Sequence, residues 1–142
     1  MVELDHQFSS DQPVAHTWET LHDLDKLIPC VQGGTVLETT APDSAKAEIR
    51  VKLGALSVRF RGTVTIIESD ADTHHAVVQV KSREVGGQGH ADADVTFDLS
   101  DGGGRLHTKA RVTGKAASRG EGMVSTVLDA MITDFTEKFA AA

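Results

Sequence analysis

The chain alternates apolar and polar residues with a period of two over most of its length, the pattern of strands that bury one face. Turns such as Gly54-Ala55 and Asp70-Ala71-Asp72 separate consecutive segments. The alternation therefore predicts a meander of antiparallel strands joined by hairpins. Its clearest segments are 2–8, 45–53, 56–66, 76–84, 91–99 and 106–112.

Two regions repeat at helical spacing instead. After the first strand, capping oxygens in Ser9-Ser10-Asp11 and a proline at Pro13 predict a short helix, and a second helical turn or two ends at Pro29. Near the C-terminus, three- and four-residue steps predict one amphipathic helix of about twenty residues. Its apolar positions are Met123, Val124, Val127, Leu128, Met131, Ile132, Phe135 and Phe139.

The order of these elements predicts an α+β helix-grip fold in a single domain, residues 1–142. The C-terminal helix is the only large amphipathic element available to cover the apolar face of the sheet. We therefore expect a curved antiparallel sheet wrapped around that helix, with two short helices following the first strand.

The inward positions of the strands are unusually small, which bears on what lies under the helix. Because protein interiors pack densely, such positions leave either a close helix or an open space. In the first alternative Met123, Met131 and Phe135 pack directly onto the sheet; we favour the second, a cavity for an apolar ligand. The small inward residues are Ala45, Ala47, Gly62, Ala76, Ser82, Ala91, Ala93, Thr108 and Ala110.

Composition excludes several classes of protein. Fourteen Lys and Arg against 21 Asp and Glu give a net charge of −7, with five Phe, one Trp and no Tyr. This disfavours nucleic-acid binding, which uses basic faces and stacking rings. No segment approaches the ~20 apolar residues of a membrane-spanning helix, and the N-terminus does not resemble a signal peptide. We expect a cytoplasmic protein.

The residues that could bind a metal ion or act in catalysis do not form a cluster in the sequence. The hairpin before His107 places it opposite about residue 98, roughly 25 Å from His90, too far to share a metal ion. Cys30 is the only cysteine, and a buried, inert thiol is the favoured interpretation. Glu84 either faces the cavity as a general acid or base, or sits at its mouth, solvated or paired with Arg83 or Arg119, which we favour. We predict no metal ligand and no catalytic residue.

Four segments stand out in order along the chain: Asp23–Cys30, Val51–Ser57 with Arg61-Gly62-Thr63, Gly87–Ala91 and Ser118–Gly120. Together they resemble the G-subunit family of carbon monoxide dehydrogenase, which belongs to the START and birch-pollen-allergen superfamily of helix-grip (SRPBCC) folds. The resemblance covers nearly the whole chain, and its specificity lies in the order and spacing of the motifs. Gln32 and Ala55 depart from the pattern, since members often carry proline there.

The resemblance implies a non-catalytic accessory protein. Members are associated with the molybdenum-containing carbon monoxide dehydrogenase and with placing that enzyme at the cytoplasmic membrane. Many continue into a C-terminal membrane-binding tail, whereas this sequence ends at Ala142; it represents either a short member or a chain without its tail. We expect a location at the inner face of the cell membrane.

The leading hypothesis joins the cavity to this family. Oxidation of carbon monoxide releases electrons that must reach a respiratory quinone, and menaquinone or ubiquinone is an elongated apolar molecule. Two alternatives remain: a membrane-recruitment adaptor with a filled core, and, less favoured, a cyclase or hydrolase that uses Glu84. The expected lining is Leu53, Phe60, Val78, Val80, Ala93, Val95, Phe97, Met123, Val127, Leu128 and Met131.

A second group of apolar residues flanks the Gly54-Ala55 turn and the end of the second short helix. We expect this group to form a lip that touches the membrane or a partner. It consists of Leu27, Ile28, Leu53, Leu56 and Val58.

Overall fold

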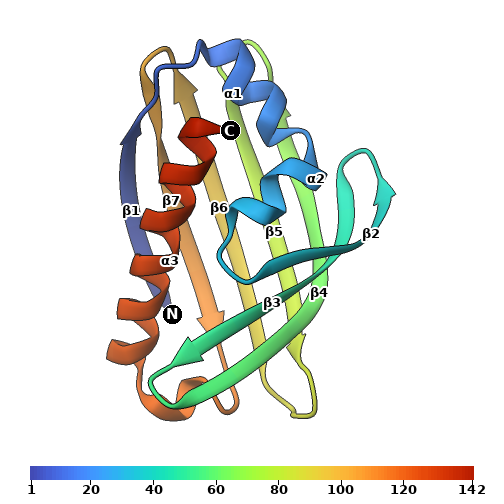
Figure 1. The fold of residues 1–142 in the computed structure, drawn as a ribbon, viewed down its shortest axis with the longest axis vertical. Coiled ribbons are helices and arrows are strands. Elements are labelled where there is room, and N and C mark those ends of the chain that lie inside the picture. The colour runs from blue at the N-terminus through green and yellow to red at the C-terminus, as the bar shows by residue number, and fades with distance from the viewer.

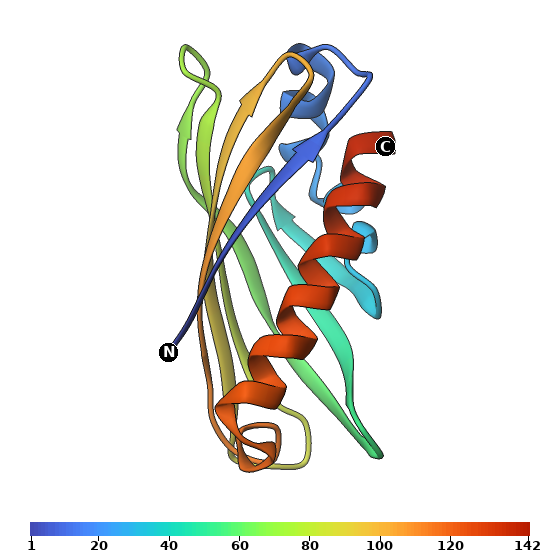
Figure 2. The same cartoon turned by 90° about the vertical axis from the view of Figure 1, so that its left-hand side faces the viewer.

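Seven antiparallel strands form one curved sheet, and the long C-terminal helix lies along its concave side (Figures 1 and 2). The structure is a computed structural model that describes residues 1–142. The strands are β1 (Val2–Ser9), β2 (Gly34–Ala41), β3 (Ser44–Leu53), β4 (Leu56–Asp70), β5 (His75–Glu84), β6 (His90–Ser100) and β7 (Gly103–Val112). The helices are α1 (Val14–Leu21), α2 (Leu24–Leu27), the short turns η1 (Ile28–Cys30) and η2 (Ala117–Arg119), and α3 (Glu121–Ala141).

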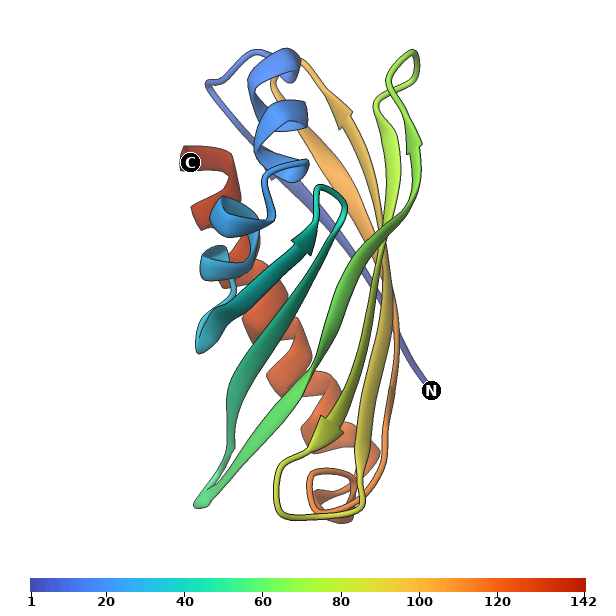
Figure 3. The ribbon, with the colours of Figure 1, turned by 90° about the vertical axis from the view of Figure 1, so that its right-hand side faces the viewer.

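The strand order is β1-β7-β6-β5-β4-β3-β2. After β1 the chain crosses through α1 and α2 to the opposite edge of the sheet, then returns strand by strand until β7 pairs with β1. Figure 3 shows β2 and β3 curling toward α2 and α3. The predicted helix-grip fold, with its meander and two short helices, is confirmed.

The predicted alternation is confirmed on the other strands, but it did not predict where the edge strand β2 begins and ends. Most of its side chains are exposed, and a bulge leaves Leu37 unpaired between Val36 and Glu38. Leu37 is 46% exposed. An edge strand with one irregular ladder has little apolar periodicity to detect.

The capping prediction for α1 was wrong. No side chain of Ser9-Ser10-Asp11 caps the helix; instead, the backbone N–H of Val14 donates to Oδ1 of Asp101, at 2.9 Å. Asp101 lies in the turn between β6 and β7, so the start of α1 is fastened to the end of the sheet by a residue remote in sequence.

The core divides into two clusters along the sheet. The larger has 16 buried residues packed beneath α1, α2 and the C-terminal half of α3, and includes the contacting rings of Phe97, Phe135 and Phe139. The smaller has six buried residues at the other end, under the start of α3: Val2, Leu53, Val58, Phe60, Ala116 and Val124. Between them, partly buried residues such as Val80 and Val95 pack against the larger cluster, and Val127 and Leu128 pack against the smaller.

Candidate functional site: an apolar cavity under α3

A cavity of about 210 Å³ occupies the space between the two core clusters. It is lined by 28 residues, 25 of them hydrophobic, from the inner faces of β3–β7, from the α2–η1 segment and from α3. Several inward residues of the central strands, such as Val80, Ala93 and Val95, are only partly buried. Small side chains in the middle of the sheet therefore leave open space, as the sequence predicted.

Ten of the eleven predicted lining residues border this cavity: Leu53, Phe60, Val78, Val80, Ala93, Val95, Phe97, Val127, Leu128 and Met131. Met123 does not. It lies in the first turn of α3 and is 40% exposed, while its neighbour Val124 points inward and is 6% exposed. The prediction for Met123 was wrong because helical spacing alone does not tell which of two adjacent apolar residues faces the sheet.

Other residues that line the cavity were not among those predicted from the sequence. Ile49 and Val51 on β3, and Ile132 and Phe135 on α3, follow the same periodicities as the predicted set and were available from it. Val31, just after η1, also lines the cavity. No periodicity signals that residue, because its position depends on how the short helices pack.

The proposed lip is not an exposed surface. Leu27, Ile28, Leu53 and Val58 are between 2% and 4% exposed, and only Leu56 is partly exposed. The first three line the cavity, and Val58 belongs to the smaller core cluster. The lip prediction was therefore wrong for these four residues, since their side chains point inward from the curved sheet and from the α2–η1 segment.

Three polar residues border the cavity: Ser82 and Thr108 from the inner face, and Asp92, which lies on the outer face of β6 opposite Lys81 and Arg111. The Ser82 hydroxyl donates to the carbonyl oxygen of Ala91, at 2.5 Å, and Asp92 accepts from the backbone N–H of Ser82, at 3.3 Å. The Thr108 hydroxyl, by contrast, is buried and has no hydrogen-bond partner. A buried hydroxyl left unpaired is costly, so Thr108 is the polar group of this cavity that a ligand can satisfy.

Glu84 is buried but does not line the cavity. Its carboxylate accepts a hydrogen bond from the backbone N–H of Lys115, at 3.1 Å, and its Oε1 lies 3.9 Å from Lys115 Nζ. The partners suggested from sequence, Arg83 and Arg119, were wrong, because the chain after β7 folds back over Glu84. A Cβ on Gly87, Gly89 or Gly114 would collide with this carboxylate, so Glu84 holds two glycine loops together.

Cys30 is 7% exposed, as predicted. Its Sγ lies 3.4 Å from the carbonyl oxygen of Lys26. Burial raises the pKa of the Cys30 thiol above its ordinary value, an effect that the positive charge of Lys138 partly offsets. The thiolate, which is the reactive form, is therefore disfavoured.

The histidines are spread over the surface of the sheet and helices. His107 lies opposite Thr96, not residue 98, and its Nδ1 is 2.6 Å from Asp5 Oδ1. His90 is therefore about 20 Å away along β6, at ~3.3 Å per residue. No group of three or more His, Cys, Asp or Glu side chains is placed to hold a metal ion.

Solved structures with the same fold are distantly related in sequence. A conserved protein from Geobacillus kaustophilus is 22% identical, with a TM-score of 0.79 over 99% of this chain and 93% of that chain. The ZhuI aromatase/cyclase from Streptomyces sp. R1128 is 12% identical, with a TM-score of 0.61 over 99% and 92%. Major latex-like protein 151 from Panax ginseng is 12% identical, with a TM-score of 0.59 over 99% and 95%. At these identities the likeness shows the fold alone.

None of the curated proteins matches the sequence. None of the helices combines the length and hydropathy that crossing a bilayer requires. The model of the CoxG family, the G-subunit family of carbon monoxide dehydrogenase, matches residues 7–142. That match spans nearly the whole chain, including every residue that lines the cavity, and the chain belongs to the CoxG family.

Proposed function

We propose that this protein is a non-catalytic carrier that holds a respiratory quinone, menaquinone or ubiquinone, and serves a carbon monoxide dehydrogenase at the inner face of the cell membrane. Family membership supports the link to the dehydrogenase. The electrons released by carbon monoxide oxidation require an acceptor, and a quinone bound away from the bilayer supplies one near the enzyme.

The observation that carries the choice of ligand is the pairing of an apolar cavity with one unpaired hydroxyl. Twenty-five of the 28 lining residues are hydrophobic, which suits a ring and an isoprenoid chain. A quinone ring presents carbonyl oxygens that accept hydrogen bonds, and the Thr108 hydroxyl can donate one. The other two polar groups already have partners.

The volume limits how much of a quinone lies inside. Ligand pockets commonly measure about 300–1,000 Å³, whereas this cavity measures about 210 Å³. The cavity therefore holds the quinone ring. The isoprenoid tail leaves the cavity between α3 on one side and β3 and η1 on the other. The lining residues there, including Val31, Ile49, Val51, Leu128 and Met131, are partly exposed.

Lipid analysis of the purified protein tests this function. The protein is incubated with, or purified from, quinone-containing membranes, and the bound lipid is extracted and identified by mass spectrometry. We expect quinone in stoichiometric amounts. Recovery of a folded protein that carries no quinone would sink the proposal.

An Ala93→Phe variant separates the carrier from an adaptor with a filled core. Ala93 is a small inward residue at the middle of the cavity, so a phenyl ring there occupies the ligand's space. Thr96→Phe is the matched control, because Thr96 is on the same strand and points outward. We expect Ala93→Phe to lose quinone and quinone-dependent electron transfer while Thr96→Phe keeps both. Full activity in both variants would favour the adaptor.

A further inference from the structure

The outer face of the sheet balances its charges over most of its area. Lys81 on β5 lies opposite Asp92 on β6, which lies opposite Arg111 on β7. One row further along, Asp94 lies opposite Lys109. Opposite charges on directly facing residues stabilise a sheet, so this part of the surface is electrostatically matched within the chain.

The corner where β3 and β4 meet β5 breaks this rule. Arg50 lies directly opposite Arg59, and Arg61 lies directly opposite Arg83. Like charges in these positions destabilise a sheet. Among these four arginines, two form ion pairs, and both pair with Glu48. Its Oε1 lies 3.5 Å from Arg59 Nη1 and 3.1 Å from Arg61 Nη2.

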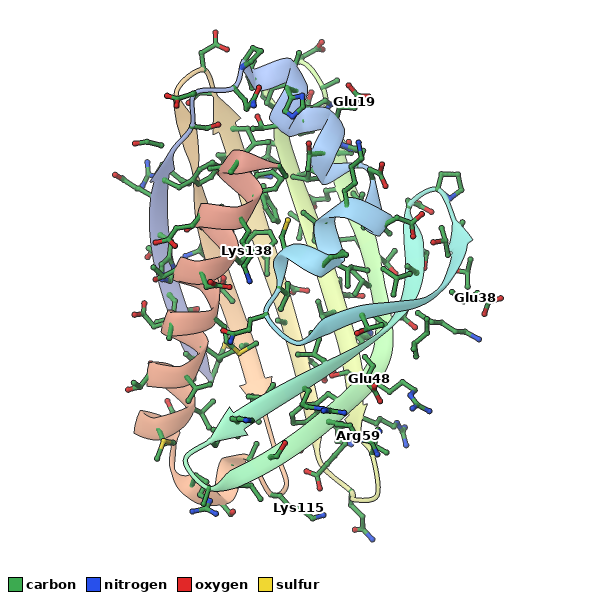
Figure 4. The ribbon with its side chains drawn as sticks, in the orientation of Figure 1. Glu19, Glu38, Glu48, Arg59, Lys115 and Lys138 are labelled. Atoms are coloured by element: carbon green, nitrogen blue, oxygen red, sulfur yellow. The ribbon has the colours of Figure 1, made fainter.

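This corner is cationic in a chain whose net charge is −7, so the cluster does not reflect overall composition. Arg50 makes no ion pair. The Lys115 side chain, 59% exposed, adds a further positive charge from the segment after β7, and its Nζ lies 3.9 Å from Oε1 of the buried Glu84. Figure 4 shows Glu48 and Arg59 side by side on β3 and β4, with Lys115 at the end of the molecule near the β3–β4 hairpin.

A hollow of about 310 Å³ lies among these cations. Its wall is formed by Arg50, Ser57, Val58, Arg59, Glu84, Val85 and Lys115. The side chain of Glu84 is 1% exposed and is turned toward the glycine loops. The charges that the hollow presents to a ligand are therefore those of Arg50, Arg59 and Lys115, with the exposed hydroxyl of Ser57 as a further donor.

We infer that this hollow, the Arg50–Arg59–Lys115 site, binds a phosphoryl group. Guanidinium forks match the oxygens of phosphate bidentately. The cations of this corner outnumber its carboxylates, Glu48 and Glu84, by three, which is enough to balance a phosphoryl dianion; they are Arg50, Arg59, Arg61, Arg83 and Lys115. The phosphoryl group belongs either to a soluble phosphate compound or to an anionic lipid headgroup. The site is separate from the apolar cavity and independent of the quinone proposal.

The test compares the protein with an Arg50→Ala/Arg59→Ala double variant. Arg105→Ala/Lys109→Ala is the matched control, because both residues lie on the same outer face among matched charges. Pyrophosphate is titrated while the backbone amides of Ser57 and Lys115 are followed by NMR. Sedimentation with phosphatidylglycerol vesicles and with neutral phosphatidylcholine vesicles forms the second arm.

We expect pyrophosphate to shift the Ser57 and Lys115 amides in the parent and the control, and the double variant to bind at least tenfold more weakly. Pyrophosphate binding by the parent should weaken with added salt. The double variant should be at least as thermally stable as the parent, which would show that it has lost the site and not the fold. If the parent sediments with phosphatidylglycerol vesicles and the double variant does not, the phosphoryl group belongs to a lipid headgroup. If the parent does not sediment with these vesicles, the group belongs to a soluble phosphate compound. Equal pyrophosphate binding by the double variant, or no amide shifts in the parent, overturns the inference.

Discussion

His6 on the edge strand β1 lies 2.8 Å, Nε2 to Oδ1, from Asp129 on α3. The two residues are 123 positions apart in sequence, and their contact fastens the middle of the covering helix to one edge of the sheet. The C-terminal end of α3 is held separately, since the Ser10 hydroxyl donates to the carbonyl oxygen of Ala140, at 2.9 Å. The N-terminal half of α3 is held by the His6–Asp129 contact, by its apolar face and by an exposed ion pair in which the Met1 amino group lies 3.9 Å from Glu121 Oε2.

Replacing Asp129 with alanine is expected to loosen α3 without unfolding the protein. The Asp129 side chain is 60% exposed, so the free energy of unfolding should fall by less than about 1 kcal/mol. Amide hydrogen exchange in the first half of α3 should accelerate, because the helix loses its link to β1. Glu137→Ala, an exposed change on the same helix, is the control. Unchanged exchange in the Asp129→Ala variant would show that apolar packing alone holds the helix.

Replacing Glu84 with alanine should be costly for stability and harmless for ligand binding. The change removes the acceptor of the Lys115 N–H and leaves a gap behind Gly87 and Gly89. We expect the free energy of unfolding, measured by urea denaturation, to fall by about 2–4 kcal/mol.

Lys115→Ala is the matched control for Glu84→Ala. It removes a 3.9 Å ion pair whose lysine is 59% exposed, and exposed pairs contribute about 0–1 kcal/mol. The Glu84→Ala protein that remains folded should bind quinone as the parent does, because Glu84 does not line the cavity. Loss of binding from that folded fraction would contradict this and return Glu84 to the candidate site.

Sequence periodicity was sufficient to predict the strands and helices whose apolar residues recur at regular spacing. Alternation along β6 placed Ala93, Val95 and Phe97 on the inner face, and the small inward residues, Ala93 among them, correctly indicated open space. It could not show contacts between distant segments. The Asp101 cap on α1 and the His6–Asp129 contact depend on turns and edges that only the assembled sheet brings together.

The polar members of the site were the least predictable. Thr108 was recognised from sequence only as a small inward residue, because its missing hydrogen-bond partner is a property of the packed interior. Met123 failed for a similar reason: adjacent apolar residues in the first turn of α3 compete for one inward position, and Val124 occupies it.

His75 gives the fold a predictable pH dependence. Its Nδ1 lies 2.6 Å from Asp98 Oδ1, and this hydrogen bond, aided by the charges of Asp98, Glu68 and Asp70, raises the pKa of His75 above its ordinary 6.5. A raised pKa in the folded state means that protonated His75 stabilises the fold. The contribution is full below about pH 6.5 and is lost as the pH rises through the folded-state pKa.

NMR titration of the His75 ring checks this directly. Asp98→Asn should lower the pKa of His75 and reduce the difference in stability between acidic and alkaline pH, while Asp94→Asn, on the same strand and face, should not. Because the His75 side chain is 37% exposed, we expect a small effect. A pKa of His75 that Asp98→Asn leaves unchanged would contradict the assignment.

Thr108→Val is expected to move stability and quinone binding in opposite directions. Valine keeps the shape of threonine but removes a hydroxyl that is buried without a partner. The free energy of unfolding of the empty protein should therefore rise by about 1 kcal/mol. Quinone affinity, measured by fluorescence quenching of Trp18 or by calorimetry, should fall about tenfold, because one hydrogen bond to the ring carbonyl contributes roughly 1.4 kcal/mol.

Thr63→Val supplies the control, because Thr63 is exposed on the outer face of β4 and should change neither quantity. The opposite signs make the Thr108 test specific. A general loosening of the core would lower both stability and affinity, and better apolar packing would raise both. Higher stability combined with unchanged quinone affinity would mean that the ring carbonyl does not reach Thr108, and a ligand without an acceptor group would then fit the cavity better.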